Sequence, residues 1–379
     1  MKINIVYIIN QLRRSGPVNV LYDIIANLDY NRFNPIVIKL MADDPDKSYT
    51  YKFQELGIEI IERNLSFWDL EMRTKHIAKE IDLLVSERNI DIINTHGYHP
   101  LLISSYMKVP IPRIDTVHCI SINSFRSSRG WLIGTYMHLR YLYRLRKIEC
   151  RVGISETVTK YYDSILRNNK SCTIYNGINT CRFNLNEKTR INLKRSLGLD
   201  IYNKVFVVVG HLSPLKDPLT VLKAYIDLID KGKLKDSCLI FCGHGTLYEK
   251  CKFLATNYHM IKFTGYINNV HEYLQVADYS ICASHSEGFG LNYIEAIMCG
   301  CVVISSKIPA FNEFTDRYFE LKQLQFEPSD KNHLAQVITD AISNDIDMTS
   351  IRKDAINRFS AQRMSIGYMD LFETYINKN

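Results

Sequence analysis

The sequence has no uninterrupted apolar run approaching the ~18–20 residues that a membrane-spanning helix needs. Its apolar start, Met1–Ile9, is short, lacks a small-residue cleavage site and runs into the polar stretch 10–14. We therefore interpret it as a first buried strand and not as a signal peptide. The ten cysteines form no C-x-x-C pair, and no Cys/His cluster has zinc-ligand spacing. These absences favour buried free thiols in a reducing, cytoplasmic setting.

Nucleic-acid reader motifs, short-period repeats and low-complexity tracts are also missing, so we predict no nucleic-acid partner. What is present is typical of a globular protein, with 46% hydrophobic and 23% charged residues. The length of 379 residues suits two domains. A net charge of +7 permits attraction to anionic substrates or anionic lipid and requires neither.

Short apolar runs alternate with helical stretches in both halves. We predict strands at 4–9, 35–40, 59–62, 91–95, 113–118, 150–154, 172–175, 204–209, 238–242, 261–264, 279–283 and 301–305. We predict helices at 18–28, 72–88, 131–147, 218–231, 247–257, 292–299 and 331–343. Many strands are rich in Val and Ile without clean alternation, which indicates parallel strands buried on both faces. The fold class is therefore α/β, with two doubly wound parallel-sheet domains at 1–185 and 186–358, separated near Asn184–Asp200.

The stretch Ser286–Ala296 carries the clearest chemistry. It lies between two apolar runs and reads as strand, glycine-broken turn, helix and strand. Glu287 and Glu295 bracket the expected start of the helix, with seven residues between them. A helix N-terminus suits a diphosphate, and carboxylates on either side accept hydrogen bonds from sugar hydroxyls. The pattern indicates a nucleotide-diphosphate sugar.

Other loops at strand ends are weaker signals, each of which also fits an ordinary turn. In Gly210–Pro218 a glycine permits a sharp turn, and Lys216 precedes a helix start, where its charge would meet a phosphate. Gly243 and Gly245 close one strand, and Gly265 with Tyr266 closes the next. In the first half the candidates are Gly16, before a helix, and the strand-end histidines His118 and His96. A lone histidine is more often structural than functional.

The block from Ala277 through Glu287-Gly288-Phe289-Gly290-Leu291 to Glu295 and Gly300 resembles the signature of family 4 of the retaining glycosyltransferases. Weaker matches run along nearly the whole chain, at Gly16, His118, 152–156, 175–179, Gly210, Lys216, Gly243, Gly245 and Gly265. This resemblance implies the GT-B fold, in which two Rossmann-like domains face across a cleft. It also implies that the segment 359–379 forms a last helix that packs back on the first domain.

The resemblance further implies roles for individual residues. Glu287 would contact the donor sugar, Glu295 the ribose, and Lys216 the departing diphosphate, while Gly16 and His118 would face the reacting centre. Glu287, Lys216 and His118 are thereby implied as catalytic. The implied donor-binding residues are Gly16, Gly210, His211, Lys216, Gly243, Gly265, Tyr266, Glu287, Gly288, Phe289, Gly290, Leu291, Asn292 and Glu295. No cofactor is implied beyond a UDP- or GDP-sugar as donor substrate.

One position departs from the family pattern. Where the family commonly has arginine after the glycine of the second loop, this sequence has His211, which donates fewer hydrogen bonds and is only partly charged near neutrality. Either activity is lower, another arginine substitutes, or catalysis has been lost. No metal is expected, because the only D-x-D spacing of the early half, Asp44-Pro45-Asp46, reads as a turn.

The stretch Phe125–Lys147 carries six basic residues and no acid, interleaved with Trp, Tyr and Leu. It fits an anionic membrane face that recruits a lipid-linked acceptor, and equally an ordinary helix with a solvated basic side. The expected function is retaining transfer of a hexose-type sugar to a hydroxyl of a lipid-linked or polysaccharide acceptor, in capsule or lipopolysaccharide synthesis. The expected location is the cytoplasm, peripheral to the inner face of the plasma membrane if the first interpretation holds. Alternatives are a non-catalytic GT-B subunit that binds glycan or stabilises a partner, and a nucleotide-sugar epimerase.

Overall fold

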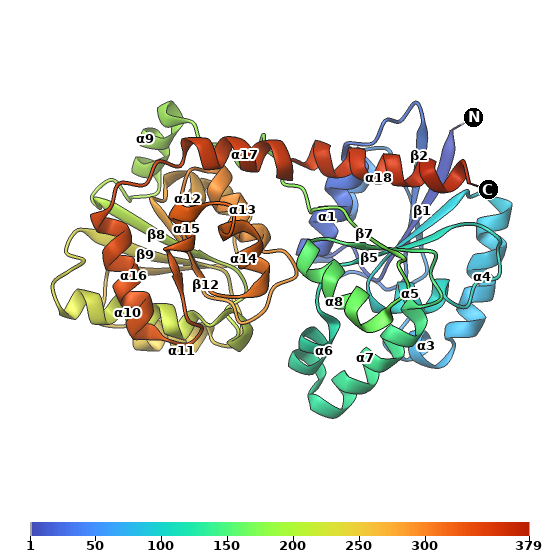
Figure 1. Cartoon of the computed structure of the whole chain (residues 1–379), viewed down its shortest axis with the longest axis horizontal. Coiled ribbons are helices and arrows are strands. Elements are labelled where there is room, and N and C mark those ends of the chain that lie inside the picture. The colour runs from blue at the N-terminus through green and yellow to red at the C-terminus, as the bar shows by residue number, and fades with distance from the viewer. Residues whose placement is uncertain (1, 379) are drawn as a thin grey trace. The chain divides into compact units, whose positions relative to one another are not determined.

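The computed structural model describes residues 2–378. The chain divides into two compact units, each with one parallel sheet (Figure 1). The first runs to Gly177 and takes back the segment from Ala361 onward, and the second is Ile178–Ser360. This division falls a few residues before the boundary at 185 that we place from sequence. The polar stretch 184–200 contains a helix, α9 (Glu187–Ser196), held to the second unit by the ion pair Arg190–Asp278 at 2.8 Å.

The sheet of the first unit has seven strands in the order β3-β2-β1-β4-β5-β6-β7. Every neighbouring pair is parallel. The strands are β1 (Ile3–Ile9), β2 (Phe33–Lys39), β3 (Glu59–Glu62), β4 (Ile92–His96), β5 (Arg113–Val117), β6 (Cys150–Gly153) and β7 (Ser171–Thr173). The central strands are buried along most of their length, as expected for strands covered on both faces.

The helices of the first unit are α1 (Gly16–Ala26), η1 (Pro45–Lys47), α2 (Thr50–Glu55), α3 (Phe67–Met72), α4 (Thr74–Glu87), α5 (Tyr98–Ser104), α6 (Ser121–Arg129), α7 (Trp131–Leu145), α8 (Glu156–Leu166) and α18 (Ala361–Ile376). The last of these returns to the first unit (Figure 1). Ser365 Oγ donates to Ile24 O at 3.0 Å, and the hydroxyls of Tyr368 and Thr116 lie 3.0 Å apart. The C-terminal segment therefore closes the face of this sheet that carries α1.

The sheet of the second unit has six strands in the order β10-β9-β8-β11-β12-β13, again parallel throughout. The strands are β8 (Lys204–Val209), β9 (Ser237–Cys242), β10 (Ile261–Gly265), β11 (Tyr279–Cys282), β12 (Val302–Ser306) and β13 (Gln325–Phe326). The remaining helical segments are η2 (Pro214–Lys216), α10 (Pro218–Asp230), α11 (Tyr248–Leu254), α12 (Val270–Val276), α13 (Leu291–Met298), α14 (Pro309–Thr315), α15 (Phe319–Lys322), α16 (Lys331–Ser343) and α17 (Thr349–Phe359).

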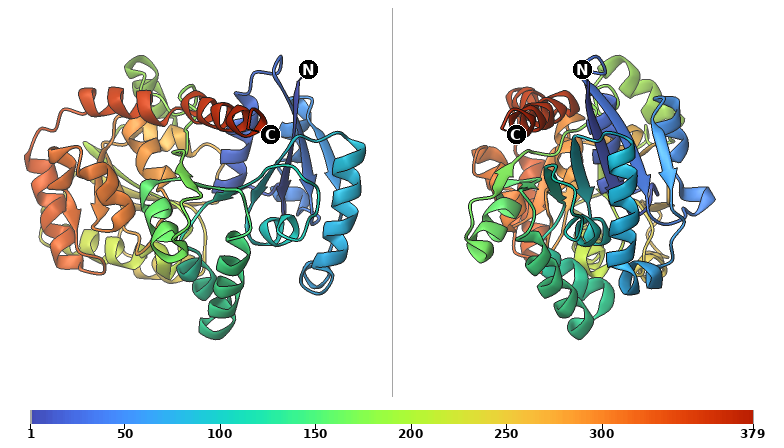
Figure 2. Two further views of the ribbon diagram at one scale, coloured as in Figure 1. Left: turned by 45° about the vertical axis from the view of Figure 1, so that its right-hand side comes forward. Right: turned by 90° about the vertical axis from the view of Figure 1, so that its right-hand side faces the viewer.

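The helix predicted at 131–147 is confirmed as α7, and a second helix that was not predicted, α6, precedes it. Gly130, at φ +80°, ends α6 and begins α7. The two helices pack tightly, since a Cβ on Gly134 would lie 2.5 Å from the backbone nitrogen of Arg126. Both views of Figure 2 show α6 and α7 projecting from the body of the first unit. The projection leaves one side of α7 uncovered, as described below.

Candidate functional site

The candidate site residues of the second unit lie where the strand order of its sheet reverses. From β8 the chain moves outward to β9 and β10, and then returns to β11 on the other side of β8. The loops after β8 and β11 therefore diverge, and a crevice opens at the carboxyl ends of these two neighbouring strands. Lys216 is in the first loop and Glu287 in the second.

Lys216 and Glu287 meet across this crevice. The Lys216 Nζ forms an ion pair with Glu287 Oε1, and Ser284 Oγ donates to the same oxygen at 2.6 Å. The Lys216 side chain is 28% exposed and that of Glu287 is 12% exposed, so the pair borders solvent and is not sealed in the core. In one crevice, the Lys216 ammonium can bind a phosphate and the Glu287 carboxylate can accept a hydrogen bond from a sugar hydroxyl.

Further contacts tie the two loops together. The backbone N–H of His285 donates to Leu215 O at 2.8 Å, and Asn292 Nδ2 donates to Val209 O at 3.0 Å. Asp217, whose side chain also caps α10, lies 3.4 Å from His285 Nε2. The positions of Lys216 and Glu287 are therefore fixed by the backbone of both loops.

The turn that leads into α13 is buried and sharply bent. Gly290 has φ +88°, and a Cβ there would lie 2.6 Å from the ring of Phe311. Phe289 is 2% exposed and packs edge-on against Phe314 and Phe359. The Phe289 side chain is thus an anchor of the core. Any contact it makes with a ligand would be through its backbone.

The α13 N-terminus itself has no side-chain cap among the described residues. Leu291 and Asn292 form its first turn, Gly288 is buried just before it, and Glu295 is partly exposed one turn further on. This arrangement leaves the positive end of the helix dipole beside Glu287.

Glycines from the loops after β8, β9 and β10 bring the backbones of these loops into contact. At Gly243, φ is +149°, and a Cβ would lie 1.9 Å from Gly210 O. Gly243 also forms an antiparallel bridge with Gly265. Next to these glycines, His211 and Tyr266 are exposed, the latter at 61%. Residue 243 must be glycine because its backbone lies so close to Gly210 O that a side chain would not fit. The sequence alone indicated only a tight turn at this position.

In the first unit, His118 follows β5 and belongs to a hydrogen-bonded row. His96 Nδ1 lies 2.9 Å from His118 Nε2, and His96 Nε2 lies 2.8 Å from Asn94 Oδ1. The Asn94 amide nitrogen donates to Ile114 O, so its oxygen is the acceptor. His96 Nε2 then carries the proton, His96 Nδ1 accepts, and His118 Nε2 donates. The Nδ1 of neutral His118 is consequently an acceptor, suited to a hydroxyl.

Burial keeps both rings neutral. It lowers the pKa of His118 to about 4, and burial together with the neighbouring His118 lowers the pKa of His96 well below its usual value. His96 is 3% exposed and His118 is partly exposed. Gly16, the other candidate of this unit, is the first residue of α1. His96 is thus a positioning residue for His118.

Two residues of these networks were not foreseen. Ser284 donates to Glu287, and Asn94 fixes the tautomer of His96. A serine at a strand end and an asparagine inside a strand carry no pattern that predicts these partners. Among residues 2–378, no group of three or more His, Cys, Asp and Glu side chains could hold a metal ion. Within the same residues, we find no helix with both the length and the apolar character that crossing a membrane demands.

Known proteins resemble the chain over most of its length. Residues 14–182 match the family model for Glycosyltransferase Family 4, and residues 189–358 match the model for Glycosyl transferases group 1. The O-antigen biosynthesis glycosyltransferase WclY of Escherichia coli is 24% identical over 379 residues, 97% of either chain. The UDP-Gal:alpha-D-GlcNAc-diphosphoundecaprenol alpha-1,3-galactosyltransferase of the same species is 24% identical over 309 residues, 78% of either chain.

Solved structures agree on the fold. The Anabaena protein HepE in complex with UDP and glucose superposes with a TM-score of 0.76 over 97% of this chain and 99% of its own, at 16% identity. The two family models together account for all but short segments of the chain, and the two parallel sheets are those of the GT-B architecture. The chain belongs to the family 4 type of GT-B glycosyltransferases.

Proposed function

We propose that this glycosyltransferase is a retaining hexosyltransferase of cell-surface polysaccharide synthesis. It would move a hexose-type sugar from a UDP- or GDP-sugar to a hydroxyl of a lipid-linked or polysaccharide acceptor. The observation that carries the proposal is the Lys216–Glu287 pair in the crevice between β8 and β11, beside the N-terminus of α13. The names of the O-antigen and diphosphoundecaprenol relatives support the acceptor class.

In this proposal Glu287 binds hydroxyls of the donor sugar, and Lys216 turns to the diphosphate as negative charge grows on it. Glu295 binds the ribose, and backbone N–H groups at 288–292 bind the sugar and diphosphate. His118 offers its Nδ1 to a hydroxyl near the reacting carbon. No nucleophile on the enzyme is needed if the acceptor attacks from the face that the diphosphate leaves. The diphosphate would then take the acceptor proton.

The test is a thermal-shift panel of UDP- and GDP-sugars, followed by a hydrolysis assay on any that bind. We expect one nucleotide sugar to raise the melting temperature selectively and to release free nucleotide slowly. Conversion of that sugar to an epimer without acceptor would instead support a nucleotide-sugar epimerase. Failure of every nucleotide sugar to bind would refute the proposal.

We also propose that α7 lies on an anionic membrane surface. Its exposed side carries Leu132, Tyr136, Leu139 and Tyr143 at helical spacing, each 55–74% exposed, while Gly134, Met137, Tyr141 and Leu145 form the buried side. Basic residues flank this exposed stripe, and the segment 121–148 contains no acid. Apolar side chains ringed by cations are typical of helices that lie in the interface of anionic bilayers.

Arg144, Arg146 and Lys147 changed together to Glu should release the protein from anionic liposomes, measured by flotation. Unchanged binding, or none in the parent, would contradict the membrane-surface proposal while leaving the transferase proposal intact.

A further inference from the structure

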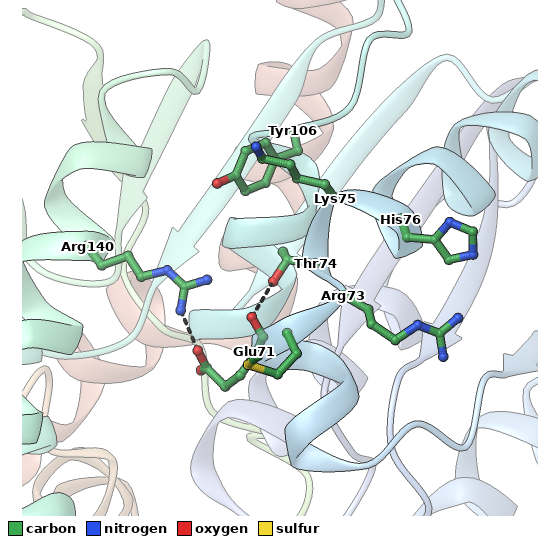
Figure 3. Close-up of a pocket in the computed structure, with 8 residues that line it drawn as sticks. Glu71, Arg73, Thr74, Lys75, His76, Tyr106 and Arg140 are labelled. Atoms are coloured by element: carbon green, nitrogen blue, oxygen red, sulfur yellow. Dashed lines mark hydrogen bonds and ion pairs between the residues drawn. The ribbon is translucent and has the colours of Figure 1, made fainter.

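A cationic pocket lies next to the exposed side of α7. Its volume is about 450 Å³, within the range of small-molecule sites. Arg73, Lys75 and His76 line it at the start of α4, Arg140 lines it from α7, and Tyr106 lines it after α5. Figure 3 shows the Lys75 ammonium beside Tyr106, whereas the Arg73 and His76 side chains point away from Arg140. All of these residues belong to the first unit.

The only acidic residue lining the pocket is already engaged. Glu71 forms an ion pair with Arg140 (Figure 3). Its other carboxylate oxygen lies at hydrogen-bond distance, 2.9 Å, from His99 Nε2. Arg73 has Asp69 at 3.4 Å, whereas Lys75 has no carboxylate within ion-pairing distance among the described residues and points its ammonium at the Tyr106 ring, 5.6 Å away. His76 Nε2 lies 3.1 Å from Glu80, so Lys75 is the lining cation without a carboxylate partner among the described residues, and its ammonium suits a phosphate group.

The pocket adjoins apolar surface through shared residues. Arg144 stacks 3.7 Å from the Tyr106 ring and 5.2 Å from the ring of Tyr143, which belongs to the exposed stripe of α7. On the other side, Met72 lines the pocket and is 80% exposed, and Trp68 of α3 is 70% exposed. A charged hollow bordered by exposed apolar side chains matches an amphiphile with an anionic head and hydrocarbon chain.

A row of polar contacts joins the pocket to the carboxyl end of β1. Asn10, just after β1, has its Nδ2 3.4 Å from His99 Nδ1, and His99 in turn holds Glu71. The loop after β1 also leads to Gly16, one of the candidate site residues. A head group in the pocket is therefore on the edge of this sheet where ligands of such folds bind.

We infer that this pocket binds the phosphate or diphosphate of a lipid-linked acceptor, with the lipid chain lying along the exposed side of α7. The inference rests on the proposed function and makes it more specific, since it assigns the acceptor to phosphate-bearing lipids. The contact of the lipid chain with α7 distinguishes this ligand from a free phosphate or diphosphate, which would bind in the pocket alone.

The experiment measures binding of the full chain to three kinds of phosphatidylcholine vesicle. One contains polyprenyl diphosphate, one contains phosphatidylglycerol at equal total charge, and one contains neither. The pocket variant is Arg73→Ala with Lys75→Ala, and the matched control is Lys2→Ala with Lys79→Ala, which removes two exposed charges elsewhere in the same unit. Lys75→Gln alone serves as a milder second variant.

We expect the parent and the control to bind polyprenyl diphosphate vesicles roughly tenfold or more tightly than phosphatidylglycerol vesicles, and the pocket variant to lose that preference. Equal binding of the parent to both vesicles, or a preference retained by the pocket variants, would overturn the inference. The inference would also be overturned if inorganic pyrophosphate, at the same concentration as the polyprenyl diphosphate, abolished binding of the parent to the vesicles. The thermal shift with the nucleotide sugar, measured on each protein, should stay unchanged. Its absence in the parent would refute the proposed donor separately.

Discussion

Glu287 receives its two partners from different parts of the second unit. Lys216 comes from the loop after β8, and Ser284 precedes Glu287 in the loop after β11. We expect Glu287→Ala to lower turnover by several orders of magnitude, because donor hydroxyls would lose their acceptor during the reaction. The fold should persist, since the side chain borders solvent. Steady-state kinetics and a melting curve check both statements, and near-normal turnover would contradict the assignment.

His211 stands where the family resemblance leads us to expect an arginine. It is exposed next to Gly210 in the same crevice loop as Lys216. If the site works with a histidine, an arginine there should add a charge-assisted hydrogen bond to the diphosphate. We expect His211→Arg to raise kcat/KM for the donor by about tenfold, the effect of ~1.4 kcal/mol. An arginine variant as inactive as the parent would favour the non-catalytic alternative.

Asp115 gives the first unit a pH dependence. It is fully buried in β5, where it accepts hydrogen bonds from Thr95 Oγ1 at 2.5 Å and Tyr141 Oη at 3.0 Å. Burial raises its pKa to about 7 despite these donors. Between its ordinary pKa near 4 and pH 7, the folded state holds a proton that the unfolded state has lost, so stability falls as pH rises.

Asp115→Asn should remove this fall of folding stability with rising pH. From pH 5 to pH 7 the free energy of unfolding of the parent should fall by roughly 2–3 kcal/mol relative to the variant. Denaturant titrations at several pH values measure the difference, and Asp46→Asn is the exposed control in the same unit. Parallel stability profiles for parent and Asp115→Asn would show that the carboxyl does not titrate in this window.

At the scale of elements, the strands were easier to predict than the helices. Runs such as 204–209 are continuous and apolar because both faces of the strand are covered, and the structure has β8 at those residues. The missed helices are α2, α3, α5, α6, α8, α9, α12, α14, α15 and α17. Most are short or carry few apolar residues in a helical stripe, and α9 has no buried residue at all. The exceptions are α8 and α17, each of 11 residues with a buried stripe at helical spacing. Their ends are set by caps and neighbouring loops, as at α3, where Ser66 before the helix and Asp69 in its first turn form a capping box.

The glycine loops of the second unit pack backbone against backbone. Gly243→Ala should destabilise the second unit by roughly 2–4 kcal/mol, because the new Cβ meets Gly210 O in a backbone conformation that alanine avoids. Gly198→Ala is the matched control, with positive φ and no neighbour within 4 Å, and should cost about 1 kcal/mol. Calorimetry of both variants tests the difference, and equal losses would mean that close approach is not the reason for glycine at 243.

At the scale of the whole molecule, the first unit is discontinuous in sequence, whereas the second is one continuous segment. The first unit is completed only by α18, which buries Met364, Tyr368 and Phe372 against it. Deleting residues 361–379 should destabilise the first unit by roughly 5 kcal/mol, the burial energy of three large side chains. The shift caused by the nucleotide sugar should survive, since all the expected donor-binding residues except Gly16 belong to the second unit. Loss of that shift with an otherwise folded second unit would contradict the division.

The sequence by itself determined the α/β class, the parallel sheets, the family and the motif at 286–296, because each depends on residue patterns that are local along the chain. Only the tertiary structure decided which side chains meet. Glu287 and Lys216 are 71 residues apart, and they touch because strand order brings β8 and β11 together. The same holds for the row from Asn94 to His118 and for the pocket between α4 and α7. Such contacts depend on the closure of long loops, which no local pattern of residues records.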